Sequence, residues 1–173
     1  MFQFADDLLL LKVVSSVNDL TDLQNDLNKL SNYCAENNLL LNPAKSEHLR
    51  LTLKKSHKLS NYIINGTKVS LIICHKHIGV WYDEKLTFNN HCDFIISKAL
   101  KKFHLLRVIC KNVNGNTFLN LYKTYILPIL EYSNLSWIPN NGQSKRIETV
   151  QRKITKFICY KLGKNNALQP KVK

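Results

Sequence analysis

Residues 2–11 read FQFADDLLLL, and two adjacent carboxylates, Asp6 and Asp7, interrupt this otherwise apolar run. Two phenylalanines alternate with a glutamine before the carboxylates, and the residues of 8–14 after them favour a buried strand. An ionised carboxylate is costly to bury without a partner, so the pair is expected at a tip rather than inside a sheet. The segment therefore predicts a strand, a tight turn that holds both aspartates, and a second strand.

A long helix follows this hairpin in the sequence. Apolar residues recur at spacings of three and four between positions 20 and 34, which is typical of an amphipathic helix. Ser16 or Asn18 suits the N-cap, and the ENN triplet at 36–38 suits the end of the helix.

Strand patterns return after the helix. Leucines alternate with polar residues from 49 to 53, after a turn marked by the Asn-Pro pair at 42–43. Asn65 and Gly66 stand between β-forming residues, which predicts a type I′ hairpin. The stretch LIICHKHIGVWYD at 71–83 is a further strand pattern. Residues 1–83 are therefore expected to form an α+β domain with mostly antiparallel strands and one long helix.

The remaining residues, 84–173, predict only helices. Segments 88–112, about 117–126 and 144–161 each place their apolar side chains on one helical face. Pro128 should bend or end the second helix, and Gly163 suits the C-cap of the third. The expected fold class is thus α+β, with antiparallel hairpins and one helix followed by an all-α domain.

Charge is distributed unevenly between these two parts. The whole chain has a formal net charge of +13, yet residues 1–48 hold three lysines against seven acids. Residues 49–173 hold 22 basic side chains against five acids, a net charge of +17. Such an excess attracts phosphate backbones, so a nucleic-acid partner is expected for the C-terminal two-thirds.

Cysteine usage and hydrophobic runs limit the cellular location. Five cysteines are an odd number without framework spacing, which favours a reducing, intracellular compartment, the nucleus or the cytoplasm. The apolar run at 8–14 is too short to span a membrane, and no basic n-region or cleavage motif precedes it. Secretion and membrane insertion are therefore not expected.

The aspartate pair suits divalent-metal chemistry. Mg²⁺ prefers carboxylate oxygens at roughly 2.0–2.1 Å and keeps several of its waters. In phosphoryl transfer by two metals, ions about 3.5–4 Å apart stabilise the attacking and leaving oxygens. An Asp-Asp dipeptide is also ordinary turn chemistry, so the dipeptide alone leaves both interpretations open.

The residues around the pair carry a resemblance to a known family. FADD resembles the (Tyr/Phe)-Ala-Asp-Asp box of reverse transcriptases, with Phe4 at its aromatic position. Further segments are similar, in the same order, to the palm, primer-grip hairpin and thumb of non-LTR, LINE-like retrotransposon polymerases of the jockey type. These segments are LLLNPAKSEHLRLTL (39–53), HKHIGVWYDEKLTFNNHCDFIISKALKKFHLLR (75–107), LYKTYILPILEYSNLSW (121–137) and RIETVQRKITKFI (146–158).

The resemblance implies roles for individual residues. Asp6 and Asp7 would be catalytic and would bind the two Mg²⁺ ions, while Lys45 matches a palm lysine that orients the triphosphate or protonates pyrophosphate. Lys45 could equally be a solvated turn lysine. Residues 1–83 would then be a partial palm and residues 84–173 a basic thumb or connection region. The implied reaction is RNA-directed DNA synthesis, with an RNA template, primer DNA and deoxynucleoside triphosphates as partners.

Nucleic-acid contacts are expected at two places. Ile78, Gly79 and Val80 match the primer-grip turn, where a glycine lets a backbone approach closely, although a structural bulge explains a strand glycine equally well. Basic residues on the expected helices favour phosphate contacts over a merely solvated face, and they position a duplex without reading its sequence. These residues are Lys98, Lys101, Lys102, Arg152, Lys153 and Lys156.

Parts of the family pattern do not appear among these segments. Enzymes of this kind need a further Asp from an earlier palm strand and fingers residues that hold template and nucleotide. The resemblance therefore implies an incomplete fragment of the transposable-element enzyme, weak or inactive as a nucleotidyltransferase on its own. Two alternatives stay open: a non-catalytic nucleic-acid-binding remnant, and an interaction protein that pairs through an exposed edge strand.

The sequence gives little support for a zinc site. Two short groups of ligand-type residues lie at 74–77 and 91–92, but neither has the spacing of ordinary structural zinc sites. No cysteine stands in a recognisable nucleophile motif. Aromatic residues at 81, 132 and 137 suit core packing better than base stacking.

Overall fold

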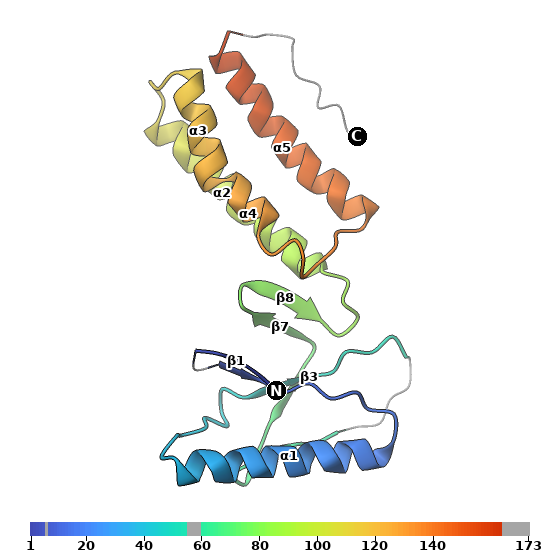
Figure 1. Cartoon of the computed structure of the whole chain (residues 1–173). Helices are drawn as coiled ribbons and strands as arrows, with labels where there is room; N and C mark the ends of the chain where they lie inside the picture. The colour runs from blue at the N-terminus through green and yellow to red at the C-terminus, as the bar shows by residue number, and fades with distance from the viewer. Residues whose placement is uncertain (6, 55–59, 164–173) are drawn as a thin grey trace. The chain divides into compact units, whose positions relative to one another are not determined.

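The computed structural model describes residues 1–5, 7–54 and 60–163, and it has a mixed α and β fold (Figure 1). The chain divides into two compact units, Met1–Ile73 and Cys74–Lys173. The sequence suggested a boundary at residue 83. The division lies earlier because the hairpin of residues 74–83 packs on the first helix of the second unit.

The first unit begins with the expected hairpin. Strand β1 (Phe2–Phe4) pairs antiparallel with β2 (Asp7–Leu9), and Phe2 lies opposite Leu9. The second strand was expected to continue to Val14, but β2 ends at Leu9, where its pairing with β1 ends. Val14 lies in exposed, irregular chain.

Helix α1 (Val17–Glu36) confirms the amphipathic pattern and its predicted N-cap. The Ser16 hydroxyl accepts a hydrogen bond from the Asp19 backbone, and the Asp19 carboxylate accepts from the Ser16 backbone, which forms a capping box. The leucine stripe of α1 packs against a small core of Tyr62, Ile64 and Val69.

Four short strands complete the first unit. The hairpin of β4 (Ile63–Ile64) and β5 (Thr67–Lys68) turns at Asn65 and Gly66, whose φ angles are +49° and +75°. Positive φ at both positions is the type I′ geometry that the sequence predicts. Strands β3 (Glu47–Leu49) and β6 (Ser70–Ile72) pair in parallel, which local patterns did not indicate.

The predicted strand through residue 53 was wrong in its length. β3 ends at Leu49, and Leu51 and Leu53 are exposed in irregular chain. Alternation alone does not form a strand unless a neighbouring strand satisfies its backbone groups, and the pairing of β3 with β6 ends at Leu49 opposite Ile72.

The second unit starts with strands β7 (Cys74–His77) and β8 (Val80–Asp83), which pair antiparallel. The sequence pattern at 71–83 is therefore not one strand but the end of β6 followed by this hairpin. Val80 of the hairpin is buried with Ile95 and Trp137, which joins the hairpin to the helices that follow.

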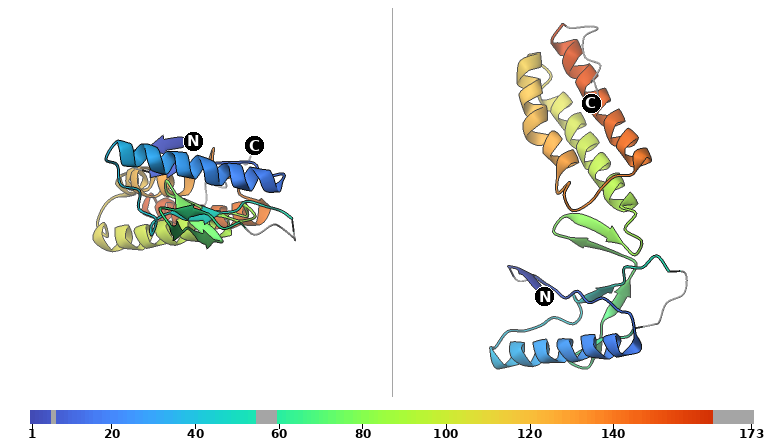
Figure 2. Two further views of the ribbon diagram at one scale, coloured as in Figure 1. Left: turned by 90° about the horizontal axis from the view of Figure 1, so that it is seen from below. Right: turned by 45° about the vertical axis from the view of Figure 1, so that its right-hand side comes forward.

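The helices are α2 (Asn89–Ile109), α3 (Gly115–Tyr125), α4 (Leu127–Glu131) and α5 (Asn141–Lys161). The three long helices of this set lie side by side in Figures 1 and 2. The helix is interrupted at Ile126, two residues before Pro128, which confirms the predicted interruption.

One apolar core holds these helices together. Its buried side chains are Ala99, Phe103, Leu106, Phe118, Tyr122, Ile126, Leu130, Val150, Ile154 and Ile158. Phe103, Phe118 and Phe157 meet edge to face, with ring centroids 5.0–6.3 Å apart. Each such pair contributes about 0.5–1.5 kcal/mol beyond the area it buries. The predicted apolar faces of α2 and α5 are thus confirmed.

Candidate functional site

Asp7 is the described member of the aspartate pair, and it lies where the turn between β1 and β2 ends. Asp6 is outside the described residues, whereas Asp7 begins β2 opposite Phe4. Ala5 adopts a left-handed conformation with φ of +54°, and its carbonyl accepts a hydrogen bond from the Gln3 side chain at 3.1 Å. The turn therefore leaves Asp7 at the end of a tight hairpin.

The Asp7 side chain is open to solvent. Asp7 is exposed, and within residues 1–5, 7–54 and 60–163 no hydrogen bond or ion pair engages its carboxylate. Both carboxylate oxygens are hard donors, the type that Mg²⁺ takes while it keeps part of its water shell. The exposed position of this carboxylate is therefore compatible with a hydrated divalent cation at Asp7.

Lys45 lies in a separate turn of the same unit. The Asn42 side chain accepts backbone hydrogen bonds from Ala44 and Lys45 at 3.1 and 3.3 Å, an Asx turn. The Lys45 side chain is exposed, and no ion pair joins it to Asp7 in the described part of the chain. The structure does not bring these two predicted catalytic residues into contact.

The predicted primer-grip residues form the turn between β7 and β8. Ile78 and Gly79 have φ angles of +43° and +83°, and Ile78 is 45% exposed at the tip. Val80 is only 1% exposed, so its side chain belongs to the core. A Cβ on Gly79 would lie 2.9 Å from Cε1 of Tyr132, so close packing by this ring requires glycine here.

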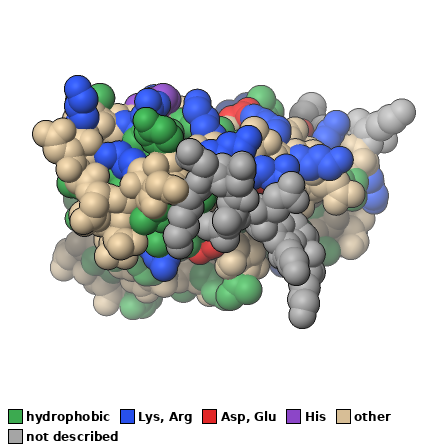
Figure 3. All heavy atoms as spheres, turned by 90° about the horizontal axis from the view of Figure 1, so that it is seen from above, with side chains coloured by type: hydrophobic (Ala, Val, Ile, Leu, Met, Phe, Trp, Pro, Cys, Tyr) green, Lys and Arg blue, Asp and Glu red, His purple; other side chains and the backbone are tan. Residues whose placement is uncertain are grey.

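The six predicted phosphate-binding residues gather in two groups, each on one face of its helix. Lys98, Lys101 and Lys102 are at i, i+3 and i+4 on α2, and Arg152, Lys153 and Lys156 are spaced within one turn of α5. Lys102 is half-buried and the other five are exposed. Arg152 also pairs with Glu148 at 3.3 Å on its own helix. Figure 3 shows Lys and Arg side chains spread over the visible face with few acids among them.

Sequence patterns did not group Lys76 and His91 with the lysines of α2. Lys76 of β7 and the buried His91 line the same cavity as Lys98 and Lys102. Lys76 shares no spacing with the helical lysines, so only the packing of the hairpin on α2 brings them together. The one local feature that distinguishes Lys76 in the sequence is its position between His75 and His77 in an alternating strand pattern.

The zinc hypothesis has no geometric support in the described residues. Within them, no three His, Cys, Asp or Glu side chains are placed to hold a metal ion. Cys74 accepts a hydrogen bond from the Asn90 amide at 3.2 Å. Cys92 is fully buried, and this burial raises the pKa of its thiol, which keeps it protonated. All five cysteines are free thiols.

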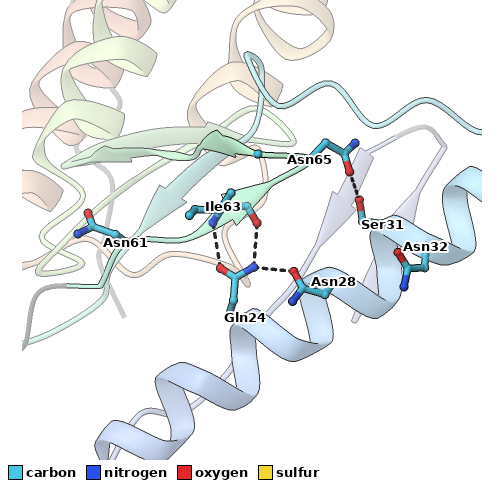
Figure 4. Close-up of a pocket in the computed structure, with 8 residues that line it drawn as sticks. Gln24, Asn28, Ser31, Asn32, Asn61, Ile63 and Asn65 are labelled. Atoms are coloured by element: carbon cyan, nitrogen blue, oxygen red, sulfur yellow. Dashed lines mark hydrogen bonds between the residues drawn. The ribbon is translucent and has the colours of Figure 1, made fainter.

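A second cavity, of about 510 Å³, lies in the first unit between α1 and the β4–β5 hairpin (Figure 4). Gln24 clamps the Ile63 backbone there: its amide oxygen accepts from the Ile63 N–H at 2.9 Å, and its amide nitrogen donates to the Ile63 carbonyl at 2.8 Å. The same nitrogen donates to Asn28, and Ser31 donates to Asn65. Because these polar groups already pair with one another, we interpret them as a structural contact between α1 and the β4–β5 hairpin.

None of the helices in the described ranges is long and apolar enough to cross a membrane. In comparisons with protein-family models, curated protein sequences and solved structures, nothing matched this chain.

Proposed function

We propose that this chain supplies the aspartate hairpin of the palm and the thumb of an RNA-directed DNA polymerase similar to those of non-LTR retrotransposons. The observation that supports this most directly is the geometry of the FADD segment. Its described residues Phe4 and Asp7 pair across the β1–β2 hairpin, and Asp7 stands exposed at the end of β2 next to the turn. A polymerase needs carboxylates presented in this way, because they must reach metal ions and substrate together.

Asp6 and Asp7 would hold the Mg²⁺ ions in this proposal. Bound there, the ions would neutralise the charge that develops on the transferred phosphoryl group. Asp7 fits such a role because its carboxylate has no competing partner among the described residues. Lys45 would bind the triphosphate of the incoming deoxynucleotide by charge. The setting would be intracellular, where the RNA template and primer DNA are found.

Metal binding at the hairpin tests the catalytic part of the proposal. Mn²⁺ added to the labelled chain should broaden the NMR signals of β1 and β2 selectively, and Mg²⁺ should reverse the effect. Asp7→Asn should abolish the broadening, whereas Glu36→Gln, at another exposed carboxylate of this unit, should leave it intact. Broadening that survives the replacement of both Asp6 and Asp7 by asparagine would refute the metal site and leave ordinary turn chemistry.

Primer extension on a primed RNA template tests catalysis itself. We expect little or no extension by residues 1–173 alone, since Asp6 and Asp7 supply only two of the three carboxylates of a polymerase site. Extension that Asp7→Asn removes would show instead that the hairpin catalyses without further carboxylates.

The second candidate function is nucleic-acid binding without catalysis, favoured by the excess of basic residues on α2 and α5. Affinity for an RNA–DNA duplex should fall steeply with salt and should not need a divalent metal. Lys153→Ala should lower the slope of log K against log salt by about 1. Lys12→Ala, which removes a lysine paired with Asp22 at 3.5 Å, is the matched control and should leave the slope unchanged.

A further inference from the structure

The second unit contains a cavity of about 520 Å³ whose walls come from β7, α2, α3 and α4. Ligand pockets in proteins usually measure roughly 300–1,000 Å³, so this one has room for a small organic molecule. Its walls combine three kinds of groups: lysines, a buried histidine and aromatic rings.

Three lysines give the cavity an unopposed positive charge. Lys76, Lys98 and Lys102 line it, and no carboxylate does. None of the three forms an ion pair with a described residue. Nζ of Lys76 lies 4.6 Å from the centre of the Phe94 ring, and Nζ of Lys98 lies 5.8 Å from the same ring. Contacts of this kind orient an ammonium group but leave its N–H donors available to an anion.

His91 supplies a buried donor without an acceptor. The residue is 0% exposed, and its Nδ1 accepts a hydrogen bond from the Trp81 backbone at 3.4 Å. Burial first, and the charge of Lys76 second, lower the pKa of His91 and favour the neutral ring. In that tautomer the proton is on Nε2, which has no hydrogen-bond partner within the described structure. A buried N–H without an acceptor is unfavourable, so a ligand oxygen here would be stabilised.

Aromatic side chains form the rest of the wall. Phe94, Tyr125 and Tyr132 line the cavity, and both tyrosines are about half exposed. The Tyr132 hydroxyl donates to the Ile78 carbonyl at 3.0 Å while its ring packs over Gly79, so this ring is held in place. Aromatic faces bind flat heterocycles such as nucleic-acid bases through stacking.

We propose that this cavity binds one nucleotide unit, with its phosphate held by Lys76, Lys98, Lys102 and the Nε2–H of His91 and its base against the aromatic wall. The unit is either a free nucleotide or one nucleotide of a single strand. The inference rests on the proposed nucleic-acid-binding function, because it assigns a specific subsite to the same helical unit. The proposed ligand needs both a phosphate and a base, because the lysines account only for the phosphate and the aromatic rings only for the base.

Titration calorimetry of the full chain with AMP, adenosine and inorganic phosphate tests this subsite. AMP should bind at least tenfold more tightly than either of its parts. Lys98→Ala should weaken AMP binding by roughly three- to tenfold, because a charge-assisted hydrogen bond is lost. Lys101→Ala removes the same charge from the same helix outside the cavity and should have no effect. Equal losses in the two variants, or equal binding of phosphate and AMP, would overturn the proposal.

Because His91 is buried, AMP binding by His91→Leu is interpreted only if far-ultraviolet circular dichroism shows that this variant folds. A second variant, Tyr125→Leu, changes a half-exposed residue of the cavity wall. Tyr125→Leu should weaken AMP binding and leave phosphate binding unchanged. An identical loss for both ligands would argue against a base site.

Two further arms separate this subsite from general duplex binding. Lys153→Ala on α5 should reduce affinity for an RNA–DNA duplex and leave AMP binding unchanged. Retained AMP binding without duplex binding would remove the proposed function and keep the nucleotide site, whereas duplex binding without AMP binding would refute the site. A short single-stranded oligonucleotide that displaces AMP would identify the ligand as part of a strand, and AMP that stays bound would identify a free nucleotide.

Discussion

Gly79 shows how one residue decides the shape of the second unit. Its φ of +83° is a conformation that side-chain-bearing residues rarely adopt, and the Tyr132 ring occupies the space of a Cβ. The glycine therefore allows the β7–β8 turn to pack closely against Tyr132. The contact with Tyr132 is therefore a second explanation for this glycine, beside the close approach of a nucleic-acid backbone that the sequence predicts.

We predict that Gly79→Ala destabilises the second unit by about 2–3 kcal/mol, since it combines positive-φ strain with displacement of the Tyr132 ring. Gly163→Ala is the matched control: φ is +69°, and nothing lies within 4 Å of its Cβ position. It should cost about 1 kcal/mol through φ strain alone. Urea unfolding measures both, and equal losses would show that the contact with Tyr132 contributes nothing.

Asp83 is the second residue on which local structure depends. Its Oδ1 accepts from the backbone of Lys85 and Thr87 at 3.1 Å, and its Oδ2 accepts from the Phe88 backbone at 2.9 Å and the Thr87 hydroxyl at 3.0 Å. Partial burial raises the pKa of Asp83, but these hydrogen bonds lower it by more, so the net pKa lies below the ordinary 3.8. The folded state therefore favours the ionised carboxylate.

We predict that Asp83→Asn costs about 1–2 kcal/mol at pH 7, because an amide nitrogen cannot accept hydrogen bonds. As pH falls, the unfolded chain takes up a proton near pH 4, before the folded chain does, so wild-type stability declines between the two pKa values. The difference between wild type and variant should consequently shrink as the pH falls below about 5. Urea unfolding along this pH series measures it, and a constant difference would contradict the ionic role.

At the scale of elements, polar caps rather than apolar contacts set where α5 begins. Asn140 and Gln143 form a reciprocal capping box at its first turn. Gln143 is 3% exposed, and its amide nitrogen also donates at 2.8 Å to the Thr87 carbonyl and to the Asn89 side chain. One side chain thus caps α5 and fixes it to the segment before α2.

We predict that Gln143→Ala destabilises the second unit by about 2–3 kcal/mol, since it removes a buried side chain together with its hydrogen bonds to the backbone of Asn140 and Thr87. Gln151→Ala, two turns later on the same helix, removes a side chain that is only half-buried and should cost under about 0.5 kcal/mol. Thermal unfolding followed at 222 nm compares the two. A small effect of Gln143→Ala would mean that Asn140 alone determines the start of α5.

At the scale of the whole molecule, the two compact units have separate cores. The first depends on Tyr62, Ile64 and Val69 beneath α1, whereas the second has the larger helical core. No residue belongs to a core cluster of both units among those described. A core that buries more apolar area gives more stability, so the second unit should be the more stable one.

We predict two unfolding transitions in urea. Ile154→Ala, at a fully buried position of the second unit, should move only the later transition, by about 2–5 kcal/mol. Ile64→Ala should move only the earlier one. A single transition that both variants shift would show that the units unfold together. Residues 74–173 expressed alone should retain the later transition.

Local sequence determined the elements that depend on neighbouring residues. Ser16 with Asp19 starts α1, and Asn65-Gly66 makes the type I′ turn. The helix interruption before Pro128 and the β1–β2 hairpin also follow from short-range patterns. Each of these rests on hydrogen bonds or steric limits within a few residues, so a reader of the sequence can predict them.

Only the tertiary structure decided which distant segments meet. Contacts between distant segments set the parallel pairing of β3 with β6 and the early end of β2. They also set the position of the β7–β8 hairpin on α2 and the cavity that Lys76 and His91 both line. Alternating leucines from 49 to 53 satisfy a strand pattern, yet strands exist only as far as a partner satisfies their backbone groups. The identity of that partner is a property of the whole fold and is not written in any local segment.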